Sequence, residues 1–149
     1  MDLIEKIKIK DSHARAVVGI GHPIKNINDV IMYAEPACLK PCVELFKKNI
    51  VTTMNDTQGV LEDSKTENGI CFIACYYGAL SQENKEIFDE LIKEGISRRY
   101  DDRGCDSISI SVPCSSEETV GEVSNKLLAI VSRLKMQDYT LLVRSLKKI

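Results

Sequence analysis

The densest group of side chains that could bind a ligand lies between residues 98 and 106 of the sequence. It contains three arginines, three aspartates and one cysteine, namely Arg98, Arg99, Asp101, Asp102, Arg103, Cys105 and Asp106. Guanidinium groups can hold a phosphate or carboxylate through paired hydrogen bonds, and the aspartates could act beside them as acid or base. More often, such interleaved charges mark a solvated segment whose ion pairs neutralise one another. We expect a polar loop here and treat it as the first candidate ligand site.

Four of the six cysteines occur in two pairs with a spacing of four residues. On a helix, this spacing places Cys38 and Cys42 on one face, close enough to share a zinc ion. Cys71 and Cys75 fall in a predicted strand, where four residues span roughly 13 Å, and the paired CxxC pattern of zinc sites is missing. We therefore expect the cysteines to pack in the core as thiols, with no metal site. Cys105 is different, because nearby arginines could lower its pKa and make it a reactive thiol.

His22 and Asp56 are the other candidates for a ligand site. His22 precedes Pro23 at the end of an expected strand, where it could transfer protons or form part of a turn. Asp56 lies in the polar stretch 55–59, whose residue types suit an ordinary turn or a small ligand at a strand end. The sequence contains no glycine-rich phosphate-binding motif and no serine-hydrolase motif, so it predicts no cofactor.

The composition is that of one ordinary globular domain spanning residues 1–149. Apolar residues make up 44% of the chain and charged residues 28%, which suffices for a core without disulfides. A net charge of −2 argues against binding to nucleic acid or membranes through bulk charge. No apolar run approaches the roughly 20 residues needed to cross a bilayer, and the amino terminus does not resemble an export signal. We expect a cytoplasmic protein with reduced cysteines.

Apolar patterning predicts the elements of the first half of the chain. The apolar run 14–20 predicts a central strand. A helical crossover follows at 28–48, where Pro41 should break or kink the helix because proline removes a backbone hydrogen bond. Residues 50–54 and 70–77 predict two further strands, and the polar stretch between them predicts a long loop.

The second half of the chain predicts two helices on either side of an alternating strand. Ser81 should cap a helix that ends at Gly95. Residues 107–112 alternate serine with branched apolar residues, as expected for a strand with one face in water. Ser115 and Glu118 form a capping box that opens the last helix.

This order of elements predicts a fold of the α+β class. Strand, helix, strand, strand, helix and strand is the ferredoxin-like βαββαβ order of a two-layer sandwich, here with an additional C-terminal helix. In that topology the first and third strands are central, and these are the most apolar strands of the sequence. The tail 139–149 fits either a strand or a helix. Many unrelated functions share this fold, so it identifies none of them.

Two functions of different kinds fit these observations. A non-enzymatic binding or regulatory module would engage a protein partner or a small ligand through its loops and open sheet face. Ser107, Ser109 and Ser111 would line that face and could also support a homodimer. The alternative is a small enzyme acting on a phosphorylated or carboxylated metabolite at the segment 98–106. RNA binding is less favoured, because sheet-based RNA readers expose more aromatic side chains. We expect the binding module.

Overall fold

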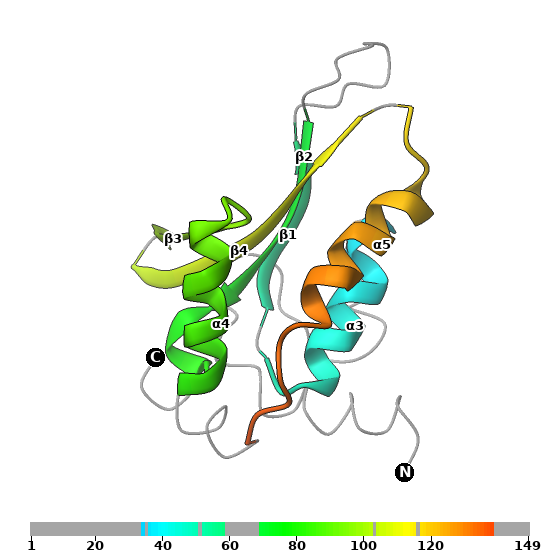
Figure 1. Ribbon diagram of the computed structural model, residues 1–149. Helices are drawn as coiled ribbons and strands as arrows, with labels where there is room; N and C mark the ends of the chain where they lie inside the picture. Colours follow the sequence, from blue (N-terminus) through cyan, green and yellow to red (C-terminus); the bar gives the residue numbers. More distant parts are fainter. Residues whose placement is uncertain are drawn as a thin grey trace.

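Figure 1 shows the computed structural model of the chain. The residues that it describes are 34, 36–50, 52–58, 69–102, 104–115 and 117–138. The strand expected at 14–20, the start of the crossover and the tail 139–149 lie outside them. The described part contains α-helices and an antiparallel sheet, so the predicted α+β class is confirmed.

The crossover helix starts as a 3-10 turn, η2 (Pro36–Cys38), and continues as α3 (Leu39–Lys47). Pro41 lies in the first turn of α3, where backbone N–H groups have no partner within the helix. The proline therefore removes no hydrogen bond of the helix. In place of the expected break, the chain changes from a 3-10 turn to an α-helix between Cys38 and Leu39. Asn49 follows the helix with a φ of 63°, a left-handed conformation that asparagine tolerates.

Two antiparallel strands follow, β1 (Thr52–Gln58) and β2 (Gly69–Tyr76). β2 agrees with the apolar run in the sequence. β1 continues through the polar stretch 55–59 as far as Gln58, and Asp56 lies opposite Phe72 in the pairing. A turn at Asp56 was the wrong expectation, because pairing with β2 outweighs the turn preference of Asn and Asp residues.

The helix α4 (Gln82–Lys93) has the boundaries that its sequence predicts. It is joined to β2 by a short 3-10 turn, η3 (Tyr77–Ala79). The Ser81 side chain caps the helix by accepting a hydrogen bond from Asn84 N at 3.2 Å. Gly95 follows the last turn with a φ of 77°, which a residue without Cβ adopts at little cost.

The segment 98–106 is a β-hairpin, and the expected polar loop is wrong. Its strands are β3 (Ser97–Asp102) and β4 (Cys105–Cys114), which pair antiparallel from Ser97 opposite Ile110 to Asp102 opposite Cys105. Charged residues suit β3 because it is an edge strand, and charges on an edge discourage pairing with another chain. On the side that faces β4, the backbone of β3 forms the hydrogen bonds of the sheet whatever its side chains are.

The last helix, α5 (Val120–Val131), starts later than its predicted capping box. Thr119 is the N-cap, and its hydroxyl accepts a hydrogen bond from Glu122 N at 3.1 Å. Ser115 N donates to the Glu118 carboxylate at 2.9 Å, but these two residues close a separate turn before the helix. The sequence analysis identified only Ser115 and Glu118, and the cap next to the apolar stripe, Thr119, begins the helix.

The sheet order is β1-β2-β4-β3, antiparallel throughout. β2 pairs with β4 along its length, from Gly69 opposite Cys114 to Tyr76 opposite Ser107. A ferredoxin-like sheet would place its first strand between these two, but their direct pairing leaves no place for a strand there, so the predicted strand order is not confirmed. β4, expected at an edge, is a central strand, because β3 forms the edge beside it.

The hydrophobic core lies on one face of the sheet. The central strands contribute pairs of facing residues to it, namely Cys71 and Val112, Ile73 and Ile110, and Cys75 and Ile108. Each helix adds fully buried side chains to the same cluster, including Leu45 of α3, Phe88 of α4 and Leu127 of α5. In Figure 1, α3 and α5 lie together beside the sheet, and α4 lies nearer to β3.

The serines of β4 point to the opposite face, but this face is not the open one that their polarity predicts. Ser107 is fully buried and Ser109 is 7% exposed, and Ala74 opposite Ser109 is also buried. The expectation of a wet face is therefore wrong for these two serines. The Ser109 hydroxyl donates to the backbone oxygen of Arg98 at 3.3 Å, so a buried serine is satisfied within the sheet.

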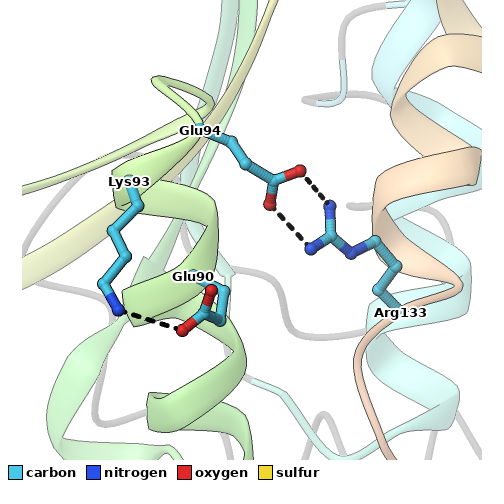
Figure 2. A network of polar contacts seen from close by, with 4 residues as sticks. All are labelled: Glu90, Lys93, Glu94 and Arg133. Atoms are coloured by element: carbon cyan, nitrogen blue, oxygen red, sulfur yellow. Dashed lines mark hydrogen bonds and ion pairs between the residues drawn. The ribbon is translucent and has the colours of Figure 1, made fainter.

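Hydrogen bonds near the ends of the helices connect α5 to α3 and α4. Lys48 Nζ donates to the backbone oxygens of Val131 and Leu134, at 2.6 and 2.8 Å, and so caps the carboxyl end of α5. Partial burial lowers the pKa of Lys48. Arg133 forms two hydrogen bonds, of 2.7 and 3.1 Å, to the carboxylate of Glu94 at the end of α4 (Figure 2).

Candidate functional site

The hairpin of β3 and β4 carries most of the charged residues that the sequence singles out. Its turn is closed by Asp101, whose carboxylate accepts a hydrogen bond from Gly104 N at 2.7 Å. Gly104 has a φ of 87°, a conformation that glycine adopts readily and most residues do not. The Asp101 carboxylate thus has a structural partner in the turn.

Arg99 and Asp106 form an ion pair across the two strands. Arg99 Nε donates to Asp106 Oδ1 at 3.0 Å, and Nη2 donates to Oδ2 at 2.6 Å, which is the two-bond geometry typical of arginine and carboxylate. The guanidinium carbon lies 3.7 Å from the centre of the ring of Tyr77, the first residue of η3. Both charged side chains are about half exposed, at 50% and 46%. The pair therefore holds a cation against an aromatic ring at the surface.

Lys85 of α4 brings a second cation to the same ring, with its Nζ 4.9 Å from the ring centre. We call the group formed by Tyr77, Lys85, Arg99 and Asp106 the Tyr77 surface. The hydrogen bonds from Arg99 hold the pKa of Asp106 below its ordinary value, and partial burial opposes this effect. The same bonds raise the pKa of Arg99, to which the charge of Asp89 on α4 adds a smaller contribution. Both groups are ionised across the physiological pH range.

Arg98 and Arg99 do not converge on one ligand. Successive side chains of a strand point to opposite faces, and Arg98 lies opposite Ser109 whereas Arg99 lies opposite Ile108. The guanidinium carbon of Arg98 lies 5.4 Å from the centre of the Tyr100 ring, on the serine side of the sheet. This arrangement does not favour a shared anion site of Arg98 and Arg99, which is one of the two alternatives that the sequence leaves open, because the segment is a strand and not a loop.

The remaining predicted residues are placed only in part. The backbones of Asp56, Asp102 and Cys105 lie in β1, β3 and β4, and their side chains lie outside the described part of the structure. Arg103 and His22 also lie outside the described residues. The roles of these five residues remain predictions from the sequence.

Tyr77 and Lys85 are the members of the Tyr77 surface that the sequence analysis does not single out. Each is separated from Arg99 by many residues, and the three meet only because β3 returns along the sheet beside α4. A hairpin prediction would have paired Asp101 with Asp106, which places Asp106 next to Arg99. No local pattern indicates Tyr77.

The five cysteines whose side chains the structure describes pack in the core, as the sequence predicts. Cys38, Cys42, Cys71, Cys75 and Cys114 are buried thiols. The sulfur atoms of Cys38 and Cys71 lie 3.4 Å apart. Within the described residues, no three His, Cys, Asp or Glu side chains are grouped so that they could hold a metal ion.

Comparisons with known proteins add no relative. The chain matches no family model, no curated protein and no solved structure. In the part of the chain that the structure describes, no helix is long and apolar enough to cross a bilayer. Function must therefore be argued from the site itself.

Proposed function

We propose that the protein is a non-enzymatic binding or regulatory module that engages a protein partner through the Tyr77 surface. The observation that carries the proposal is the position of Arg99, stacked on Tyr77 at 3.7 Å and fixed by two hydrogen bonds to Asp106. Tyrosine and arginine dominate the energetics of protein interfaces. Side chains already held in one conformation lose less entropy on binding, which increases affinity.

Several observations favour this proposal over the small enzyme of the alternative. The charged groups expected to act on a metabolite are engaged with the protein itself, Arg99 with Asp106 and Asp101 with the turn at Gly104. Arg98 and Arg99 lie on opposite faces of β3, which does not favour a shared anion site.

A homodimer through the serine face has less support than the Tyr77 surface, because Ser107 and Ser109 are buried. A cytoplasmic location belongs to the same proposal, since a core rich in thiols suits a reducing compartment.

The proposal is tested by quantitative affinity purification with matched variants. Bound proteins are compared between the wild type, Tyr77→Ala, Arg99→Ala and the control Arg133→Ala. Arg133 is a fair control because it is also a half-exposed arginine with two hydrogen bonds to a carboxylate, on a different surface. Loss of a central interface residue typically costs about 2 kcal/mol or more, so recovery of a true partner should fall by at least roughly tenfold in both test variants.

Two outcomes would count against the proposal. Partners recovered equally by all variants would mean that the Tyr77 surface is not the interface. Stabilisation of the wild type by phosphorylated or carboxylated metabolites in a thermal-shift screen, lost in Arg99→Ala, would favour the enzyme or small-ligand alternative.

A further inference from the structure

Cys38 and Cys71 form a buried contact between two thiols that are distant in the sequence. Their sulfur atoms lie 3.4 Å apart, and both residues are 0% exposed. Cys38 stands at the junction of η2 and α3, and Cys71 stands near the start of β2. The Cys38 thiol also lies 3.7 Å from the backbone oxygen of Phe72. No step of the proposed binding function uses this pair.

The separation of the two sulfur atoms is close to what a disulfide requires. A disulfide bond is about 2.05 Å long, so the sulfur atoms must approach each other by roughly 1.4 Å. β2 is held by β1 on one side and β4 on the other, so Cys71 is the fixed partner. Cys38 is the N-cap of α3. The approach of the two sulfur atoms therefore requires a shift of the turn that carries Cys38.

Three further thiols of the core lie near this pair. Burial raises the pKa of Cys42 to about 12, and the nearby Cys71 raises it further. Burial also raises the pKa of Cys75 and of Cys114. Cys38 and Cys71 are as deeply buried as these three residues, so it is the contact between their sulfur atoms, and not easier ionisation, that singles them out.

We propose that Cys38 and Cys71 are an oxidation site, at which a peroxide converts the two thiols into a disulfide. The first thiolate attacks a peroxide oxygen and becomes a sulfenic acid, and the other peroxide oxygen leaves as water once protonated. The second thiolate attacks the sulfenic sulfur, the S–S bond forms, and a second water leaves. Two thiols lose two electrons and two protons, and one peroxide accepts them to give two waters.

The bond would join the start of α3 to the centre of the sheet and close a loop between residues 33 positions apart. A cross-link of this kind stabilises the folded state mainly by restricting the unfolded chain. Because both thiols are buried, the reaction should be slow in the closed protein and should follow opening of η2. The disulfide would then hold η2 against β2.

The test treats the full-length wild type with hydrogen peroxide, blocks the remaining thiols and maps the cross-linked peptides without reduction. The expected result is a Cys38–Cys71 peptide, together with a rise in Tm of roughly 5–10 °C that dithiothreitol reverses. A cross-link that involves any other cysteine, or six thiols that all remain free for alkylation in denaturant, would overturn the proposal.

Matched variants sharpen the test. Cys38→Ala should abolish the peroxide-dependent rise in Tm, whereas Cys42→Ala, four residues along the same helix, should retain it. The reverse pattern would assign the reaction to Cys42 and overturn the proposal. If Cys38→Ala does not fold, the peptide map of the wild type still decides, because it needs no variant.

Discussion

At the scale of single residues, Gln137 shows how a polar side chain can be buried at little cost. It is 6% exposed, and each of its side-chain groups has two partners. Nε2 donates to the backbone oxygens of Asn49 and Ala79, and Oε1 accepts from Ser81 N and Asn84 Nδ2. An amide side chain has two donors and two acceptor sites, so all four are used. The residue joins the ends of α3, η3 and α4 at one point.

Replacing Gln137 by alanine should lower the free energy of unfolding by about 2–4 kcal/mol, because four polar groups in buried or part-buried positions would each lose a hydrogen bond at once. Urea unfolding measures the change. Met136→Ala is the control, since Met136 belongs to the same segment and is 71% exposed. A loss below about 1 kcal/mol for Gln137→Ala would show that water replaces the amide without penalty.

At the scale of elements, α4 illustrates how far local signals determine a helix. Its cap at Ser81 and its end at Gly95 depend on residues within one turn of each boundary. The hairpin shows the opposite case. Ser97–Asp102 has the composition of a loop, and it is a strand because β4 offers it a partner. Local side chains therefore determine where α4 begins and ends, whereas pairing with β4 determines that Ser97–Asp102 is a strand.

The substitution Ser81→Ala should destabilise the protein by about 1 kcal/mol, because Asn84 N would lose its acceptor at the helix start. Gln82→Ala, at the adjacent exposed position, should change stability by less than about 0.5 kcal/mol. Chemical denaturation of the two variants separates the effects. Equal losses in both would mean that the cap at Ser81 contributes nothing of its own.

The hairpin ion pair predicts a pH-dependent contribution to stability. Arg99 lowers the pKa of Asp106 in the folded state, so the pair contributes above the ordinary pKa of aspartate, about 4, and the contribution is lost as the pH falls through the lower folded value. Both side chains are about half exposed, so the contribution should not exceed about 1 kcal/mol.

Unfolding of wild type and Asp106→Asn at several pH values checks this prediction. The difference between the two proteins should be constant from pH 6 to pH 8 on the order of a few tenths of a kcal/mol, and should vanish in acid. It should also shrink in high salt, which screens exposed charges. A difference that grows as the pH falls would contradict the assigned direction.

At the scale of the whole molecule, one cluster of apolar side chains joins the sheet to all three described α-helices. Leucine, isoleucine, valine and cysteine form most of it, since the chain contains no tryptophan. Ile110 lies at its centre on β4 and is fully buried, whereas Ile92 on α4 is 40% exposed. The two isoleucines therefore contribute differently to the free energy of unfolding, and only the tertiary structure shows which of them is buried.

The same truncation should therefore have unequal effects at these two positions. Ile110→Ala should cost about 3–4 kcal/mol through lost burial and a residual cavity. Ile92→Ala should cost less than about 1 kcal/mol, because its side chain already contacts water and alanine favours a helix. Comparable losses, measured by urea unfolding, would place Ile92 in a buried environment and contradict the described core.

The candidate site was foreseen from the sequence only in outline. The charge-rich segment 98–106 drew attention to Arg99, because clustered guanidinium and carboxylate groups are visible in any linear sequence. Its partner ring at Tyr77 and the cation of Lys85 come from other elements, so no local pattern could reveal them. A shared anion site of Arg98 and Arg99, one of the alternatives that the sequence left open, is not favoured, because a strand places successive side chains on opposite faces.

What the sequence determined by itself is the class of the fold, the helix α4, the strand β2 and the burial of the cysteines. These follow from periodicity, caps and hydrophobicity, which act over a few residues. The tertiary structure decided that β4 is central, that its serines are buried and that Arg99 meets Tyr77. Those outcomes depend on which strands pair. Pairing brings together residues that are far apart in the chain, and no short stretch of sequence indicates which strands will become neighbours.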